Sequence, residues 1–555
     1  MRGDYREREP ERARAREKEE REPAGGRRKQ VFGTRARAPR SSVSPALARD
    51  ARIGSCRCKT RRNARARALV LRGAPFPARP LLSPPDGRRR RPPFVFRRPL
   101  ARNSPLPPPS NPSPPTTTQQ PTAAGDSSAY QRLGVADDDV VIVAALRTPL
   151  TKARRGGLRD TDAVDLLSTV FKAALAQSGV EPAALGDIVV GSVLGPSSQR
   201  ANEARIASFF AGIPEQVPVR TVNRQCSSGL QAVADVAAAI RAGFYTVGLA
   251  AGVETMTAHP MTWEGGVNPR IADFPVAQGC LMPMGVTSEN VAAKFGVDRR
   301  TQDAFAASSH RKAAAARAAG KFRDEIVPVR TVTRDPKSGD ETPIVVSEDD
   351  GIRPEVTPEA LAQLKTVFKK DGTTTAGNAS QVTDGAAAVL LMTRREAARR
   401  GLPILGVFRS FAAVGVDPSI MGVGPAVAIP AAVKSAGLSS VDDVDVFEIN
   451  EAFASQATYC VRELGIDPSK VNPNGGAIAL GHPLGATGAR CVATLLHEMR
   501  RRGRAARFGV VSMCIGSGMG AAAVFEAGGE NDGPLPHARA VAGQATGLSR
   551  DARAV

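Results

Sequence analysis

One cysteine of the chain stands directly before a stretch that predicts a helix. The stretch is VNRQCSSGLQAVADVAAAI (222–240), where apolar, alanine-rich residues follow at helical spacing. Backbone N–H groups at a helix start lack intrahelical partners and favour negative charge. We therefore expect them to lower the pKa of Cys226 and to hold an oxyanion on a thioester carbonyl. Ser227, Ser228 and Gly229 are small enough to admit a substrate. The alternative is a buried, inert cysteine, as most free cysteines are.

Only one of the five histidines lies in a segment with room around it. His482 stands in NPNGGAIALGHPLGATGAR (472–490), which is rich in glycine, and Pro483 excludes ordinary helix at that point. His482 is the candidate base for the Cys226 nucleophile. The alternative is a structural histidine that hydrogen-bonds a turn. The other histidines are assigned to a loop, to helix surfaces or to the Gly- and Ala-rich tail: His259, His310, His497 and His537.

Two further polar groups stand where strands are predicted to end. VVSMCIGSGMG (510–520) breaks into glycines after Cys514, and the strand-like AAAVFE that follows excludes a dinucleotide-binding loop. The N–H of Gly516 is a candidate oxyanion donor. Asn450 in EINEAFASQ (448–456) is either a helix N-cap or the holder of a water. Two thiols, an imidazole and an amide suit thioester chemistry, in which one thiolate takes up an acyl group and the other moves a proton beside a carbonyl.

The elements that must position these groups begin near residue 137. Short apolar segments alternate with helical patterns, which indicates an α/β fold with mostly buried strands. The second half faintly repeats the plan of the first, since each has Val-Asn before a small-residue turn and a helix. Residues 256–371 are interpreted as an inserted subdomain of loops with one alanine-rich helix (301–320). The other predicted elements are strands at 137–150, 186–195, 217–223, 245–256, 385–393, 404–414, 442–450, 508–516 and 521–527 and helices at 162–179 and 485–503.

The positive charge of the chain is concentrated in an N-terminal arm. The 555 residues carry a formal net charge of +22, and residues 1–125 hold 31 basic and 10 acidic residues, which leaves 45 and 44 for the rest. The Pro-rich stretch at 105–125 and the scarcity of apolar residues predict disorder. The arm is interpreted as a leader, as an organelle transit segment or as a nucleic-acid-binding arm. The last is disfavoured because few aromatic residues are interleaved with the arginines.

Composition also narrows the class of protein. No run of 18 apolar residues occurs, so no membrane span is predicted. The chain has seven cysteines, and their odd, unspaced set argues against a disulfide framework and against a metal site. Reduced thiols favour an intracellular compartment. The cysteines of the body are Cys226, Cys280, Cys460, Cys491 and Cys514.

Four motifs together carry a resemblance. CSSG (226–229), NEAF (450–453), GHP (481–483) and CIG (514–516) occur in the order and spacing of the thiolase family. About residues 130–527 resemble the peroxisomal 3-ketoacyl-CoA members of that family in plants. The resemblance implies a five-layer αβαβα sandwich of two similar halves with an inserted loop domain, and a homodimer or tetramer. It implies thiolysis of 3-ketoacyl-CoA by CoA, giving acyl-CoA and acetyl-CoA in fatty-acid β-oxidation.

The resemblance also implies a role for each motif residue. Cys226 is the nucleophile that becomes acylated, and His482 activates it. With a water held by Asn450, His482 binds the thioester oxygen. Cys514 exchanges the proton at the alpha carbon of acetyl-CoA, and the N–H groups of Cys226 and Gly516 form a second oxyanion hole. CoA is a substrate, and neither a metal nor a redox cofactor is implied.

The resemblance further implies a domain plan and a contact to CoA. Ser380 in AGNAS is similar to a residue that touches the pantetheine of CoA. The expected divisions are an extension at 1–125, a first half at 126–396 with the loop domain at about 256–371, a second half at 397–527 and a flexible tail at 528–555.

Several alternatives stay open. The resemblance implies the peroxisome, but neither the N-terminal signal of similar plant proteins nor a C-terminal Ser-Lys-Leu occurs, so a plastid or mitochondrion is the alternative. The other activity considered is acetoacetyl-CoA thiolase running in the Claisen direction. A nucleic-acid-binding or scaffold protein is the alternative from another class, and the intact motifs argue against it. Cys280 is hypothesised to form a reversible disulfide with Cys226, the alternative being a plain cysteine.

Overall fold

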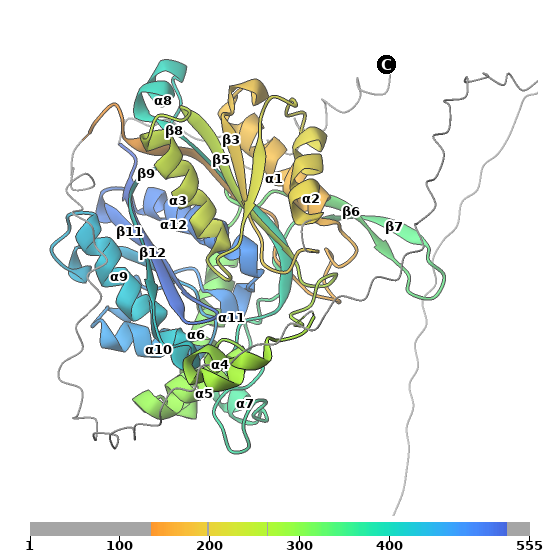
Figure 1. The fold of residues 1–555 in the computed structure, drawn as a ribbon, viewed down its shortest axis with the longest axis vertical. Coiled ribbons are helices and arrows are strands. Elements are labelled where there is room, and N and C mark those ends of the chain that lie inside the picture. The colour runs from red at the N-terminus through yellow and green to blue at the C-terminus, as the bar shows by residue number, and fades with distance from the viewer. Residues whose placement is uncertain (1–134, 197–198, 264, 530–555) are drawn as a thin grey trace, which may run out of the picture. The chain divides into compact units, whose positions relative to one another are not determined.

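The computed structural model describes residues 135–196, 199–263 and 265–529 (Figure 1). The predictions for the arm at 1–125 and for nearly all of the tail lie outside the described residues. The main sheet has ten strands. In the first half they are β1 (Val140–Arg147), β2 (Thr151–Lys152), β3 (Asp187–Gly191), β4 (Val219–Val222), β5 (Val247–Thr255) and β8 (Thr383–Thr393), and in the second half β9 (Gly406–Gly415), β10 (Val446–Ile449), β11 (Phe508–Ile515) and β12 (Met519–Ala527).

The two halves of the sheet share one topology. The first runs β4-β3-β5-β8-β1, with β3 parallel to β4 and β5, and with β8 antiparallel to β5 and β1. The second runs β10-β11-β12-β9 with the same directions, and a parallel bridge from Phe447 to Val471 takes the place of β4. The halves join where Val141 and Ile142 of β1 pair with Val407 and Gly406 of β9. The predicted internal repeat is therefore confirmed.

Helices lie on both sides of each half and between them. The layer between the halves consists of α3 (Ser228–Arg241) and α12 (Leu484–Arg502), which pack on each other and share one apolar core with strands of both halves. α1 (Ala163–Ser178) covers the other face of β1, β5 and β8, with α2 (Gln199–Phe210) beside it. α9 (Gly424–Ser435) covers β9, β11 and β12. This αβαβα layering confirms the predicted fold class (Figure 1).

The central helices approach each other at glycines. A Cβ atom on Gly488 would lie 2.1 Å from the backbone nitrogen of Leu230, and one on Gly229 would lie 2.7 Å from the carbonyl oxygen of Gly485. Only residues without a side chain fit this crossing. The first turns of α3 and α12 therefore touch backbone to backbone, which brings the segments before them, with Cys226 and His482, to the same place.

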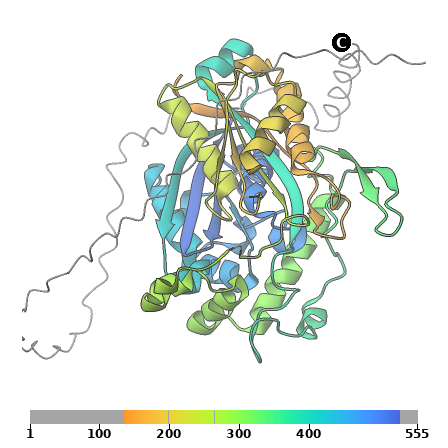
Figure 2. The ribbon, with the colours of Figure 1, turned by 45° about the vertical axis from the view of Figure 1, so that its right-hand side comes forward.

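The inserted segment holds more regular structure than its sequence predicted. The alanine-rich helix is present as α6 (Arg299–Ala318), but further helices and a hairpin accompany it. They were missed because short helices bounded by Pro and Gly give few turns of periodicity. The helices lie together at one end of the main sheet (Figures 1 and 2). These elements are α4 (Pro275–Gly279), α5 (Met284–Phe295), α6 (Arg299–Ala318), α7 (Pro358–Ala362), β6 (Val329–Arg334) and β7 (Glu341–Val346).

The remaining helices complete the second half and its junction. They are α8 (Arg394–Arg400), α10 (Ala454–Glu463) and the short α11 (Ala477–Leu480), which leads to His482. Within the described residues, none of the helices combines the length and the apolar composition that crossing a membrane requires.

Candidate active site

The predicted site residues come from four separate segments. Cys226 follows β4 and precedes α3, and Asn450 follows β10 directly. His482 lies between α11 and α12, and Cys514 lies near the end of β11. The contacts described below join them in two pairs, His482 with Asn450 and Cys226 with Cys514.

A tight turn presents the thiol of Cys226. The side chain of Ser228 closes this turn, because its Oγ accepts from the N–H of Arg224 at 2.9 Å and donates to the carbonyl of Gln225 at 2.6 Å. Gln225 has a φ of 50°, which is uncommon for a residue with a side chain. The helix itself begins at Ser228, so Cys226 stands just outside its first turn. Such backbone strain is often found beside functional groups.

The expected low pKa of Cys226 is wrong for the free protein. Burial raises the pKa of this thiol to about 11, and the nearby carboxylate of Glu254 acts in the same direction. The N–H groups of Gly516 and of Cys226 itself lower the pKa but do not outweigh burial. The sequence indicates the start of the helix, but it does not show that the folded chain buries the sulfur of Cys226. The same two N–H groups are those that the resemblance implies for an oxyanion hole, and both act on the sulfur.

His482 is buried and held in one tautomer. Its Nε2 lies 3.4 Å from Nδ2 of Asn450, and its Nδ1 lies 2.7 Å from Oγ1 of Thr487. Because the Asn450 amide nitrogen can only donate, Nε2 accepts and Nδ1 carries the proton that it donates to Thr487. Burial, together with the positive charge of Arg490, lowers the pKa of His482 to about 3. The imidazole is therefore neutral, with an accepting nitrogen toward Asn450.

The oxygen of the Asn450 amide lacks a hydrogen-bond donor among the described residues. Oδ1 of Asn450 is buried and has no hydrogen-bond partner among the described residues. A buried carbonyl oxygen of this kind needs a donor, which a water or a substrate can supply. This geometry fits the predicted role of Asn450 in holding a water.

Cys514 is fully buried at the end of β11. It packs against Met421, Ala452 and Phe453, the last two from the NEAF motif. Burial raises the pKa of its thiol well above the usual value, and the neighbouring Cys226 acts in the same direction. The two sulfurs are therefore close enough to influence each other, and both are protonated in the free protein.

Sequence reasoning missed the buried carboxylate that supports the His482 segment from one side. Glu451 accepts from Nδ2 of Asn472 at 2.8 Å, from Oγ of Ser309 at 2.6 Å and from the N–H of Ile478 at 3.1 Å. Ile478 belongs to α11, just before His482. The position of Glu451 directly after Asn450, at the predicted end of a strand, could have indicated its role. A carboxylate buried at such a place needs several hydrogen-bond donors.

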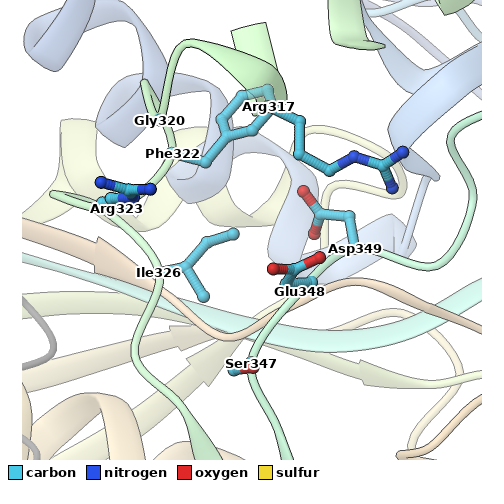
Figure 3. A pocket seen from close by; sticks show the side chains of 8 residues that line it. All are labelled: Arg317, Gly320, Phe322, Arg323, Ile326, Ser347, Glu348 and Asp349. Carbon is cyan, nitrogen blue, oxygen red and sulfur yellow. The ribbon is translucent and has the colours of Figure 1, made fainter.

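A small pocket elsewhere in the molecule is separate from this site. It lies between the end of α6 and residues 347–349, and Arg317, Phe322 and Asp349 border it (Figure 3). None of the four predicted catalytic residues lines it. Nη1 of Arg147 lies 2.7 Å from Oδ1 of Asp349, so this carboxylate has a structural partner.

Comparison with known proteins settles the family. The family model described as "Thiolase, N-terminal domain" matches residues 140–395, and the one described as "Thiolase, C-terminal domain" matches residues 402–527. The chain belongs to the thiolase family. It is 68% identical over 424 residues to 3-ketoacyl-CoA thiolase 2, peroxisomal, of Arabidopsis thaliana, covering 76% of this chain and 91% of that protein.

Solved thiolase structures agree with this fold. The dimeric peroxisomal thiolase of Saccharomyces cerevisiae superposes with a TM-score of 0.65 at 46% identity, covering 71% of this chain and 99% of that one. Human mitochondrial 3-ketoacyl-CoA thiolase in complex with CoA gives a TM-score of 0.63 at 38% identity, covering 70% and 98%.

Two further predicted residues of this thiolase lie near the site. Ser380 is half-buried, and its N–H donates to the carbonyl of Ala452 at 3.0 Å, beside Asn450 and Glu451. Cys280 is exposed, and its Sγ lies 3.8 Å from the carbonyl oxygen of Ser517, next to Gly516. The hypothesis of a disulfide between Cys280 and Cys226 stays a prediction.

The assignment of two histidines to helix surfaces is wrong. His310 and His497 are both buried, because α6 and α12 are covered on more than one side. Nδ1 of His310 accepts from the N–H of Arg353 at 3.3 Å, and Nε2 of His497 donates to the carbonyl of Ala145 at 3.0 Å. Both are structural histidines of the thiolase. His537 lies outside the described residues.

Proposed function

We propose that this thiolase cleaves 3-ketoacyl-CoA with CoA, giving acetyl-CoA and an acyl-CoA shortened by two carbons. The observation that carries the proposal is the pairing of His482 with Asn450 and of Cys226 with Cys514, because the segments before α3 and α12 meet where the first turns of these helices cross. Their placement in a chain 68% identical to a protein named as a 3-ketoacyl-CoA thiolase supports it. The sequence comparison supports the substrate, and the geometry supports the chemistry.

The first half of the reaction forms an acyl-enzyme. The imidazole of His482 takes the proton of Cys226, whose sulfur then attacks the 3-keto carbon of the substrate. The N–H groups of Gly516 and Cys226 act on this sulfur and lie where they can stabilise an oxygen on the attacked carbon. The bond between the alpha and beta carbons then breaks, and Cys514 donates its proton to the released alpha carbon of acetyl-CoA.

The second half reverses the proton movements. The thiolate of Cys514 takes the proton of incoming CoA, whose sulfur attacks the acyl group on Cys226. The Cys226 sulfur leaves and takes back its proton from His482. Protons and electrons balance over the cycle, so CoA is the only co-reactant that the proposal requires.

The resting charges suit this order of events. Burial keeps both thiols protonated and the imidazole neutral. A proton moved from Cys226 to His482 creates a thiolate and an imidazolium side by side, each stabilising the other where little water competes. The nucleophile is thus generated when substrate is present and is protected from oxidants before that.

The experiment that tests this function measures CoA-dependent cleavage of acetoacetyl-CoA and of a long-chain 3-ketoacyl-CoA by the full chain. We expect both to be cleaved, and Cys226→Ser to lose roughly 10³-fold or more of the rate. Cys491→Ala is the matched control, since this buried cysteine packs in the apolar core between the two halves and should retain activity. Cleavage of acetoacetyl-CoA alone would favour the acetoacetyl-CoA thiolase. Retained activity in Cys226→Ser would contradict the mechanism.

We also propose a homodimer that forms through the free edge of β4. β4 is the last strand of its half of the sheet, and no described strand pairs with its outer edge. An exposed strand edge offers unpaired backbone groups to a second copy. The yeast relative is described as dimeric, which supports this proposal.

The proposed compartment is the peroxisome. Its support is the similarity to several plant proteins named as peroxisomal. Expression of the full chain with an internal tag in plant cells tests it, and co-localisation with plastids or mitochondria would overturn it.

A further inference from the structure

A buried carboxylate that the reaction does not use joins the two halves at the site. Glu254 ends β5 and has no exposed surface. Its two oxygens accept from the N–H groups of Val193 at 2.9 Å, Leu194 at 3.0 Å and Gly485 at 2.8 Å. Oγ of Ser192 donates to it at 3.2 Å. Four donors converge on two oxygens, an arrangement that suits an ionised carboxylate because a protonated one would lose acceptor capacity.

The donors come from both halves of the molecule. Residues 192–194 follow β3 of the first half, whereas Gly485 lies in the first turn of α12 of the second. The backbones meet here without side chains between them, since a Cβ on Gly252 would lie 2.2 Å from the carbonyl of Gly485. A carboxylate at this position also interacts favourably with the positive end of the dipole of α12, a 19-residue helix.

This contact lies three residues after His482 in the sequence. Pro483 and Leu484 are all that separate the imidazole from the clamped Gly485. Glu451 holds Ile478 on the other side, so buried carboxylates fix the backbone on both sides of His482. Cys226 lies in the same half as Glu254. His482 lies in the other half, which Glu254 binds through the N–H of Gly485.

We propose that Glu254 is a positioning residue for thiolysis, whose carboxylate fixes the start of α12 and so sets His482 opposite Cys226. The proposal rests on the proposed function. Glu254 touches no reacting atom in this role. A small displacement of a reacting group costs about 10²-fold in rate, so loss of the clamp should act mainly on kcat.

The charge of Glu254 supplies a second readout that a merely structural residue would not give. This carboxylate raises the pKa of Cys226, in addition to the larger effect of burial. Burial raises the pKa of Glu254 itself, whereas its backbone donors and the positive charge of Arg200 oppose that rise. Removal of the negative charge should therefore lower the pKa of Cys226 and make the free thiol react faster with an alkylating agent.

The test compares Glu254→Gln and Glu254→Asp with Glu498→Gln in the full chain. Glu498 is the matched control, a buried carboxylate near the other end of α12 that binds Asn474 at 3.0 Å. For Glu254→Gln we expect kcat to fall by about 10²-fold, KM for CoA to change by less than about 3-fold, and iodoacetamide to alkylate Cys226 faster at pH 8. Glu254→Asp keeps the charge but shortens the reach, so kcat should fall while alkylation stays near the wild-type rate.

The apparent melting temperature separates positioning from stability. The positioning role is wrong if kcat of both Glu254 variants falls only in proportion to their melting temperature and Glu498→Gln shows the same relation. A kcat for Glu254→Gln within about 3-fold of wild type would also overturn it. Alkylation needs no substrate, so an inactive wild-type chain would refute the proposed function while leaving this measurement valid.

Discussion

At the scale of single residues, the tautomer of His482 depends on one hydroxyl. Oγ1 of Thr487 accepts a hydrogen bond from Nδ1 and thereby keeps the proton on Nδ1, so that Nε2 stays unprotonated and can act as the base. Thr487→Val keeps the shape and removes the acceptor. We expect kcat for 3-ketoacyl-CoA cleavage to fall by about 10-fold, which corresponds to about 1–2 kcal/mol for one hydrogen bond. Thr487→Ser should stay close to wild type, and equal rates for the two variants would contradict this role.

The raised pKa of Cys226 gives a second prediction at this scale. A thiol with a pKa of about 11 holds little thiolate at neutral pH, and its thiolate fraction rises about tenfold per pH unit below that value. We expect iodoacetamide alkylation of Cys226 to increase steadily from pH 7 to pH 10 without a plateau. Peptide mass spectrometry distinguishes it from Cys280, whose exposed thiol serves as the internal control. A plateau near pH 7 would instead indicate a lowered pKa.

The site residues divide into those that sequence reveals and those that it does not. Cys226, His482 and Cys514 stand in local surroundings of glycine or small residues, and such surroundings are visible in the sequence. Glu254 accepts a hydrogen bond from Gly485, more than 200 positions away, so only the folded chain shows the contact. The pKa of Cys226 was mistaken for the same reason, because burial comes from distant segments whereas the helix start is local.

At the scale of elements, the contact between α3 and α12 decides how the two halves meet. We expect Gly488→Ala to destabilise the protein by about 1–3 kcal/mol, because its Cβ would lie 2.1 Å from the backbone nitrogen of Leu230. Thermal unfolding should show a melting temperature lower by roughly 2–4 °C for each kcal/mol. Gly415→Ala is the matched control, since no atom lies within 4 Å of its added Cβ. Equal melting temperatures for both variants would show that the crossing can relax.

The strands were predictable because they are short apolar segments buried on both faces. β1 and β5 are buried throughout, and in β8 only the last residue is partly exposed. Their bounds agree with the predicted bounds within a few residues. The inserted segment was less predictable, since its helices α4 and α7 span only five residues each. Periodicity needs several turns to emerge from composition.

At the scale of the whole molecule, the alternation of strands and helices indicated the fold class, and the repeated Val-Asn hinted at two related halves. The joining of those halves could not be predicted. It depends on two residue pairs between β1 and β9 and on the glycine crossing of α3 with α12. Neither contact leaves a periodic signal, because each joins positions far apart in the chain.

The proposed dimer gives a prediction at the same scale. The carbonyl of Pro218, just before β4, accepts from Ile188 of β3, and the carbonyl of Val222 accepts from Ser192, just after β3. The backbone of the intervening Thr221 therefore faces the free edge. Thr221→Pro removes a donor from that edge without removing one from the β3–β4 pairing, and edge strands tolerate proline. We expect wild type to sediment at twice the monomer mass and the variant to dissociate at least ~100-fold more readily, about 3 kcal/mol. Thr221→Val keeps the N–H and should remain dimeric. A Thr221→Pro variant that is as dimeric as wild type would place the interface elsewhere.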